Sequence, residues 1–195
     1  MSRVGFIGLG IMGKPMAKNL LKAGIDLMVC DLNEQAVKEV VECGAQASSY
    51  REIGEKCDIV FLILPNGDIS KNVLFDEGGV AQTLTAGKVV CDMSSVTPVE
   101  SKECFAGLEK IGVGFVDSPV SGGEPGAVNG TLAFMAGGRQ EDFDKLMPYY
   151  NIMGSSAVLI GDSGSGSVTK LANQIIVNNT IACLLYTSPS PRDST

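Results

Sequence analysis

A glycine-rich segment after the first apolar run is the feature that most constrains how this chain can fold. The run is Val4-Gly5-Phe6-Ile7, and it leads through Gly8-Leu9-Gly10-Ile11-Met12-Gly13 directly into an amphipathic helical pattern. In such a strand–turn–helix unit the first glycine allows a tight turn, the second lets the backbone approach a pyrophosphate, and the third lets the helix pack on the strand. The helix N-terminus offers free N–H groups to the phosphates. We therefore predict that these six residues bind a dinucleotide.

An aspartate at the end of the next apolar run bears on which dinucleotide is bound. Asp31 follows Met28-Val29-Cys30, close to the separation of about 20 residues at which a carboxylate meets the adenosine ribose hydroxyls. A carboxylate there repels the 2′-phosphate of NADP, and no arginine follows, since Leu32 and Asn33 come next. We expect NAD as the cofactor, with NADP less favoured.

Short β-branched runs alternate with helical patterns along most of the chain. Strands are expected at residues 3–7, 26–30, 59–64, 89–92, 114–116, 132–136 and 157–160. Helices are expected at 12–23 and 34–43, each before a glycine, and at 98–111, which opens on the capping box of Thr97 and Glu100. This alternation indicates a parallel sheet covered on both faces. The predicted fold is α/β, a doubly wound, mostly parallel Rossmann-type sheet.

The chain divides into three expected parts. Residues 1–162 form the NAD-binding Rossmann domain, and residues 163–182 begin a long helix that introduces a second unit, with an apolar stripe that includes Leu171 and Ile175. Residues 183–195 have no periodicity and contain two prolines. They resemble the translation of a sequencing adapter, so we interpret them as a non-native tail; a disordered natural tail is the alternative.

The composition excludes several kinds of chemistry. Histidine is absent from the 195 residues, which removes Ser-His-Asp hydrolysis, Cys-His nucleophiles and His-ligated zinc. Acid/base chemistry must then use lysine, tyrosine, a carboxylate or a thiol. The six cysteines contain no C-x-x-C motif and are expected to be small buried hydrophobes in a reducing cytosol, so no metal site is predicted.

Charge and hydropathy limit the expected partners. The formal net charge of −7 argues against nucleic acid and anionic membranes, which require a clustered positive field. No apolar run approaches the roughly 20 residues of a membrane span, and no leader opens the chain. We therefore expect a cytoplasmic protein with a small-molecule partner.

Three further segments could border a bound ligand. Leu64-Pro65 and the loop at Ser94-Ser95 each follow a predicted strand, and in a doubly wound sheet the carboxyl ends of strands face the ligand crevice. Ordinary turns would have the same spacing. The third segment, residues 117–130, combines hydroxyls and glycines and is suited to binding a carboxylate with backbone N–H groups; a mobile surface loop is the alternative.

Lys170 and Asn173 are neighbours on one face of the last predicted helix, at i and i+3. A lone lysine near a helix start is usually solvated. A different interpretation follows from the resemblance of the whole chain to a known family.

Three motifs in order make the segment from about residue 4 to residue 182 resemble the β-hydroxyacid dehydrogenases. They are the Gly8–Gly13 fingerprint, Asp117-Ser-Pro-Val-Ser-Gly-Gly123 and Gly166-Ser-Val-Thr-Lys-Leu-Ala-Asn173. The resemblance implies that Lys170 is the catalytic acid/base, that Ser121, Gly122 and Gly123 bind the substrate carboxylate, and that Asn173 orients it. Leu64, Pro65 and Ser95 would join the cofactor site, although the family usually has threonine where Ser95 stands.

The resemblance also implies a small 3-hydroxy acid or semialdehyde as substrate. Family members follow the long helix with an all-helical domain that builds a homo-oligomer, and we expect that domain to be missing here. The chain would then bind cofactor but turn over poorly. A non-catalytic dinucleotide-binding module is the alternative from a different class.

Overall fold

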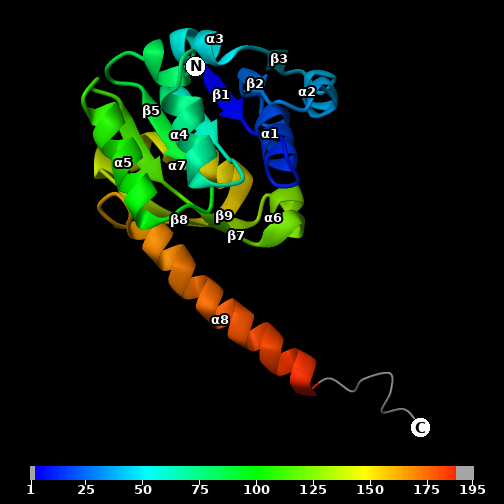
Figure 1. Ribbon diagram of the computed structural model, residues 1–195. Coiled ribbons are helices and arrows are strands. Elements are labelled where there is room, and N and C mark those ends of the chain that lie inside the picture. The colour runs from blue at the N-terminus through cyan, green and yellow to red at the C-terminus, as the bar shows by residue number, and fades with distance from the viewer. Residues whose placement is uncertain (1–2, 188–195) are drawn as a thin grey trace.

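The computed structural model describes residues 3–187, and their centre is one nine-stranded sheet (Figure 1). Its strands run in the order β3-β2-β1-β4-β5-β6-β8-β7, with β9 also paired to β8. They are β1 Val4–Ile7, β2 Leu27–Cys30, β3 Gln46–Ala47, β4 Ile59–Leu62, β5 Val89–Asp92, β6 Gly114–Asp117, β7 Val120–Ser121, β8 Leu132–Gly138 and β9 Gly154–Gly161.

The first six strands form the order of a dinucleotide-binding sheet, 3-2-1-4-5-6. All pairs among them are parallel, whereas β8 runs antiparallel to both β6 and β7 and parallel to β9. The predicted doubly wound, mostly parallel sheet is therefore confirmed. The carboxyl ends of β1, β2, β4, β5 and β6 consequently meet at one edge.

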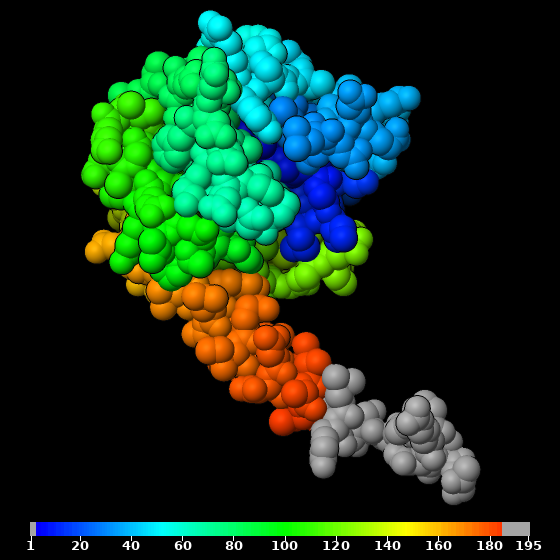
Figure 2. Space-filling view, viewed as in Figure 1, coloured from blue at the N-terminus to red at the C-terminus, as the bar shows by residue number. Residues whose placement is uncertain are grey.

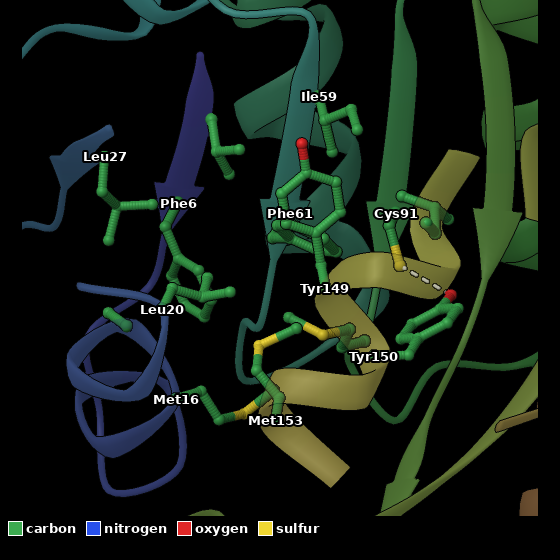
Figure 3. Close-up of a cluster of buried hydrophobic side chains, with 14 of the residues drawn as sticks. Phe6, Met16, Leu20, Leu27, Ile59, Phe61, Cys91, Tyr149, Tyr150 and Met153 are labelled. Carbon is green, nitrogen blue, oxygen red and sulfur yellow. Dashed lines mark hydrogen bonds between the residues drawn. The ribbon is translucent and has the colours of Figure 1, made fainter. Parts of the chain in front are cut away.

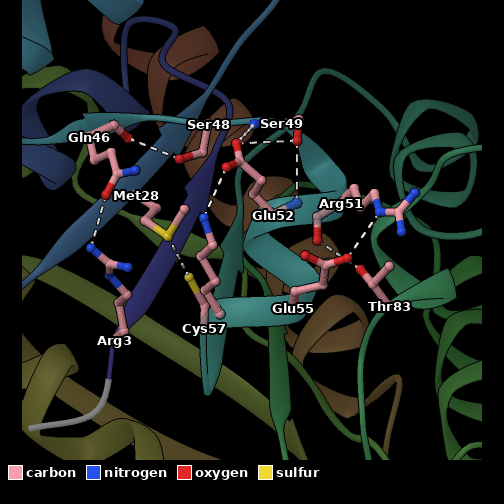
Figure 4. A network of polar contacts seen from close by, with 11 residues as sticks. Arg3, Met28, Gln46, Ser48, Ser49, Arg51, Glu52, Glu55, Cys57 and Thr83 are labelled. Atoms are coloured by element: carbon pink, nitrogen blue, oxygen red, sulfur yellow. Dashed lines mark hydrogen bonds and ion pairs between the residues drawn. The ribbon is translucent and has the colours of Figure 1, made fainter.

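Helices cover both faces of this sheet. They are α1 Gly13–Lys22, α2 Glu34–Val41, α3 Tyr50–Lys56, α4 Gly67–Phe75, the 3-10 helix η1 Val80–Gln82, α5 Pro98–Glu109, α6 Gly123–Asn129, α7 Gln140–Met153 and α8 Ser165–Thr187. The predicted capping box of Thr97 and Glu100 is present at α5, with Pro98 as the first helical residue. The same motif opens α3 at Ser49 and Glu52, and Figure 4 shows it with the hydrogen bond from Thr83 to the Arg51 carbonyl.

Two apolar cores flank the sheet because successive residues of a strand point to opposite faces. In β4, Ile59 and Phe61 belong to the core under α1, α2, α6 and α7, whereas Val60 and Leu62 belong to the core under α3, α4 and α5. Figure 3 shows the first core, where Phe61 meets Tyr149 at an edge-to-face angle of 66°. Both faces of the central parallel strands β1, β2, β4, β5 and β6 are thus covered by apolar side chains, and the polar groups that could act in chemistry lie at the ends of these strands.

The last helix departs from the prediction. It begins at Ser165 and continues to Thr187, five residues beyond the expected end at residue 182, so the first part of the expected tail is helical. The rest of that tail, residues 188–195, lies outside the described residues. Figures 1 and 2 show α8 projecting away from the body of the domain, to which only its first turns are attached.

The segment 117–130 contains regular secondary structure, unlike the mobile surface loop that the sequence left as the alternative to a carboxylate-binding segment. Its middle residues form β7, paired with β8 through Val120 and Phe134, and the following residues form α6. Pairing with a strand later in the chain imposes this order, which the local glycine-rich composition does not indicate. Among residues 3–187, no helix is long and apolar enough to cross a membrane, and no group of three or more potential metal-binding side chains occurs.

Candidate functional site

The three glycines of the fingerprint have three different surroundings. Gly8 has a φ of +98°, and a Cβ atom there would lie 2.2 Å from the carbonyl oxygen of Ile63. A Cβ atom at Gly13 would lie 1.9 Å from the carbonyl oxygen of Gly8, so α1 packs directly on the turn. A Cβ atom at Gly10 would meet nothing within 4 Å, because this residue borders open space. That free space beside the backbone is what a pyrophosphate requires.

Asp31 ties this turn to the end of β2. Its carboxylate accepts hydrogen bonds from the backbone N–H groups of Leu9, at 2.5 Å, and Asn33, at 2.7 Å. The side chain borders a cleft of about 490 Å³ that also contains the backbone of residues 8–13. Leu32, Tyr50, Ile69 and Val73 add apolar lining to the same cleft. The cleft therefore combines a carboxylate, an apolar wall and an open glycine turn, a combination suited to an adenosine with its ribose and phosphates.

A second cavity continues from this cleft at the carboxyl edge of β4 and β5. It has a volume of about 340 Å³ and is lined by residues that include Met12, Leu64, Pro65, Ser95, Gly123 and Lys170. The backbone N–H of Leu64 donates to Ser94 Oγ at 2.8 Å, and the N–H of Ser94 donates to Asp92 Oδ1 at 2.9 Å. The loops after β4 and β5 are thus joined, and the predicted loop residues Leu64, Pro65 and Ser95 lie together.

Lys170 lies on α8 where that helix meets the second cavity. Its side chain is half-buried, and burial lowers the pKa of its amine below the ordinary lysine value. Among residues 3–187, no side chain forms a hydrogen bond or ion pair with Lys170. The Lys170 side chain also lines a neighbouring hollow of about 380 Å³, together with Ser95, Asn66 and Gln174. An amine with a lowered pKa that faces a cavity can give or accept a proton there.

Of the other residues predicted to bind substrate, only some line the cavity that Lys170 faces. Gly123 lines the cavity together with Lys170. Ser121 ends β7 and is half-buried, and Gly122 is the exposed residue that precedes α6, with a φ of +133°. Asn173 does not line that cavity, and its Nδ2 is buried without a hydrogen-bond partner in the described part of the chain. The roles of Ser121, Gly122, Gly123, Asn173 and Lys170 stay predictions.

Two buried residues near the site lie in segments that the sequence analysis named, but neither was assigned a role there. Ser94 bridges the loops after β4 and β5, as described above, and only the adjacent Ser95 was singled out. Asp117, at the end of β6, is fully buried and accepts hydrogen bonds from backbone groups of residues 164 and 167. For Asp117, the available sequence signal was the position of an aspartate at the carboxyl end of a buried strand.

The fold and the cleft together define a dinucleotide-binding domain of the Rossmann type. Residues 3–161 match the family model described as the NAD binding domain of 6-phosphogluconate dehydrogenase. Taken with the relatives described next, this match shows that the chain belongs to the β-hydroxyacid dehydrogenase family, whose NAD-binding domain it contains.

Two curated relatives illustrate the similarity. The chain is 41% identical to 2-hydroxy-3-oxopropionate reductase of Escherichia coli over 176 residues, covering 90% of this chain and 60% of that protein. It is 40% identical to 2-(hydroxymethyl)glutarate dehydrogenase of Eubacterium barkeri over 183 residues, covering 93% of this chain and 61% of that protein. The chain thus spans about three fifths of the length of these relatives.

A solved structure supports the same assignment. The crystal structure of 3-hydroxyisobutyrate dehydrogenase from Salmonella typhimurium superposes with a TM-score of 0.87 at 32% identity, covering 94% of this chain and 65% of that one. The predicted family, fold class and NAD-binding domain are therefore confirmed.

Proposed function

We propose that this domain belongs to an enzyme that reduces 2-hydroxy-3-oxopropionate (tartronate semialdehyde) to glycerate with NADH, in a reversible reaction. The 41% identity to 2-hydroxy-3-oxopropionate reductase supports this substrate. The observation that carries the proposal is the half-buried amine of Lys170, which faces the cavity that Pro65, Ser95 and Gly123 also line. We further propose a cytoplasmic location and a homo-oligomer formed through parts of the enzyme outside this chain.

The proposed chemistry assigns one task to each part of the site. NADH, when bound, supplies the hydride that goes to the aldehyde carbon. The Lys170 ammonium stabilises the alkoxide that develops on the aldehyde oxygen and donates its proton to that oxygen. Ser121, Gly122 and Gly123 bind the substrate carboxylate through the hydroxyl and backbone N–H groups, and Asn173 orients the substrate beside Lys170.

The lowered pKa of Lys170 suits both directions of this reaction. An ordinary lysine, with a pKa of about 10.4, is a ready acid at neutral pH but a poor base. Because burial lowers the pKa of Lys170, a larger fraction of the neutral amine is present to accept the alcohol proton during oxidation. The lack of histidine in the chain leaves lysine as the cation best suited to this role.

Substitution of Lys170 in the whole enzyme tests the catalytic part of the proposal. Lys170→Ala should reduce kcat by about 10²-fold or more while leaving NADH affinity within about twofold, because the adenosine cleft is unaffected. Lys110→Ala, at the exposed C-terminal end of α5, is the matched control and should retain full activity. If Lys170→Ala retains full activity, the chain is a dinucleotide-binding module without this chemistry.

The substrate is tested separately. A second candidate is 3-hydroxyisobutyrate, because the chain is 39% identical to the mitochondrial 3-hydroxyisobutyrate dehydrogenase of mouse over 89% of its length; glyoxylate and succinic semialdehyde are further alternatives. Comparing kcat/KM for tartronate semialdehyde, 3-hydroxyisobutyrate and these aldehydes decides among them. A higher kcat/KM for any substrate other than the tartronate semialdehyde–glycerate pair would overturn our choice.

A further inference from the structure

A buried carboxylate holds the beginning of the helix that carries Lys170. Asp117 is the last residue of β6 and is fully buried. Its Oδ1 accepts a hydrogen bond from the backbone N–H of Gly164 at 2.6 Å, and its Oδ2 accepts one from the N–H of Ser167 at 2.9 Å. Both donors belong to the entry into α8, so one side chain of the sheet fixes the turn and the first helical residues together.

Two glycines allow this entry to lie directly on the sheet. A Cβ atom at Gly166 would lie 2.3 Å from the carbonyl oxygen of Met135 and 2.9 Å from Asp117 Oδ2. A Cβ atom at Gly137 would lie 2.8 Å from the backbone nitrogen of Gly166 and 2.9 Å from Asp117 Oδ1. The backbones of β8 and α8 therefore approach so closely around the carboxylate that no side chain fits between them.

A second polar contact joins the same turn to α5. The hydroxyls of Ser101 and Ser167 are 2.9 Å apart and both residues are buried. Lys170 follows Ser167 by three residues, on the neighbouring position of the same helix face. The orientation of this first turn thus determines where the side chain of Lys170 leaves the helix.

The charge at this position has no cationic partner. Asp117 has no ion pair among the described residues, and burial raises its pKa from 3.8 to about 6 despite the two backbone donors. At neutral pH the carboxylate is nonetheless mostly ionised, where it also faces the positive N-terminal end of α8. A buried charge that costs stability is more typical of a functional position than of a structural one.

We propose that Asp117 is a positioning residue, whose carboxyl group fixes the first turn of α8 and thereby holds the Lys170 amine in its half-buried place at the cavity. This inference rests on the proposed function where it treats Lys170 as the acid/base. The anchoring itself concerns only the geometry of α8 and is tested without turnover.

Asp117→Asn tests the anchor in the chain itself, because asparagine has the same size but presents an amide N–H₂ in place of one acceptor oxygen. Released from the anchor, Lys170 becomes exposed, so its pKa should rise toward the ordinary lysine value, as measured by NMR of ¹³C-methylated lysines. Loss of the negative charge without movement would instead lower the Lys170 pKa further. The two explanations therefore predict opposite signs.

A buried carboxyl on the neighbouring strand provides the matched control. Asp92 is paired in register with Asp117 and is equally buried, but its carboxylate accepts a hydrogen bond from Ser94 rather than from α8. Asp92→Asn should not raise the pKa of Lys170. A rise in both variants would indicate general loosening of the domain and overturn the proposal.

A measurement on the unsubstituted chain covers the case in which Asp117→Asn does not fold. Opening of this turn returns Asp117 to its lower, ordinary pKa, so protonation favours the closed turn. Amide hydrogen exchange at Gly164 and Ser167 should therefore slow at least tenfold, after correction for the intrinsic pH dependence, when the pH falls through the titration of Asp117. Unchanged exchange would overturn the proposal.

The other ionisable groups around the anchor are Asp92 and Cys91 on β5, Tyr150 on α7, Lys102 on α5 and Asp162 in the turn before α8.

Among these neighbours, only another carboxyl could mimic the titration of Asp117. Burial raises the pKa of the Cys91 thiol and of the Tyr150 hydroxyl, so both stay neutral. The Asp92→Asn variant should retain the pH-dependent exchange, and its loss there would assign the effect to Asp92 and contradict the proposal. If Lys170→Ala keeps full activity, the proposed function fails, whereas the exchange and pKa results still decide whether Asp117 anchors α8.

Discussion

The carbonyl oxygen of Gly8 lies 1.9 Å from the position that a Cβ atom of residue 13 would occupy. No alanine fits there unless the turn and α1 move apart, since the oxygen belongs to the backbone. The Cγ2 of Ile63, 2.8 Å from the same position, restricts movement on the other side. We therefore predict that Gly13→Ala lowers the free energy of unfolding by roughly 2 to 3 kcal/mol, measured by urea denaturation.

Gly10→Ala, unlike Gly13→Ala, should leave the stability nearly unchanged and should weaken cofactor binding. A Cβ atom at residue 10 meets nothing within 4 Å, and its φ is not positive, so the free energy of unfolding without ligand should stay within about 0.5 kcal/mol of the original value. The added methyl group occupies the space that the pyrophosphate needs, so NADH affinity should fall at least about tenfold. Fluorescence titration measures this, and unimpaired NADH binding would place the cofactor elsewhere.

Asp31 should decide between the two nicotinamide cofactors. Its carboxylate borders the cleft and is held by the N–H groups of Leu9 and Asn33. Asp31→Asn removes the charge that repels a 2′-phosphate and weakens the hydrogen bonds to the ribose, so the ratio of NADH to NADPH affinity should fall about tenfold or more. Asp58→Asn is the control, because it removes an exposed charge just before β4, at the opposite edge of the sheet. Equal ratios in both variants would contradict this role of Asp31.

The parts of the fold that depend on local signals could be predicted from the sequence. β5 lies at Val89–Asp92 as predicted, and α5 opens at the predicted capping box. The apolar run of β4 and the glycine turn after β1 were also identified, since burial on both faces leaves a continuous apolar pattern. The capping box of α3 gives the same sequence signal as that of α5, but no helix was predicted there.

The parts that depend on distant contacts could not be predicted. β7 has two residues, and its pairing with β8 joins Ser121 to Ala133. Asp117 contacts backbone groups 47 and 50 residues later in the chain. The cavity beside Lys170 likewise combines α8 with loops that follow β4 and β5. Such contacts leave no periodic pattern, so the family resemblance rather than composition identified Lys170 as a candidate.

The exposed surface of α8 leads to a prediction about association. Its large apolar residues Val168, Leu171, Ile175, Ile176, Ile181 and Leu184 are 50% to 67% exposed, and Figure 2 shows the helix projecting from the domain. We expect the chain to self-associate, because apolar surface of this extent favours burial. Size-exclusion chromatography with light scattering should give a mass above 20.4 kDa that rises with concentration.

A paired variant tests whether α8 is responsible for this association. Ile175→Glu together with Ile176→Glu should restore a monomer, since both side chains are exposed and glutamate is a good helix former. Val99→Glu, at a similarly exposed position on α5, should leave the association unchanged. A chain that is monomeric at every concentration before substitution would contradict the prediction.

The raised pKa of Asp117 predicts how stability changes with pH. The folded protein binds the Asp117 proton more tightly than the unfolded chain does, because the pKa rises from 3.8 to about 6 on folding. This contribution to stability is fully present below pH about 4 and is lost as the pH rises through about 6. A shift of this size corresponds to a loss on the order of 3 kcal/mol.

The comparison of the original chain with Asp117→Asn isolates this contribution, since asparagine does not titrate. The difference in free energy of unfolding between the two should move against the original chain by roughly 2 kcal/mol between pH 4.5 and pH 7.5, as measured by urea denaturation. Carboxyls whose pKa is lowered by their partners, such as Glu39 and Glu52, act in the opposite direction, but they are common to both proteins and cancel. A difference that stays constant across this range would mean that Asp117 has an ordinary pKa, and the carboxylate at the base of α8 would then carry no cost in stability.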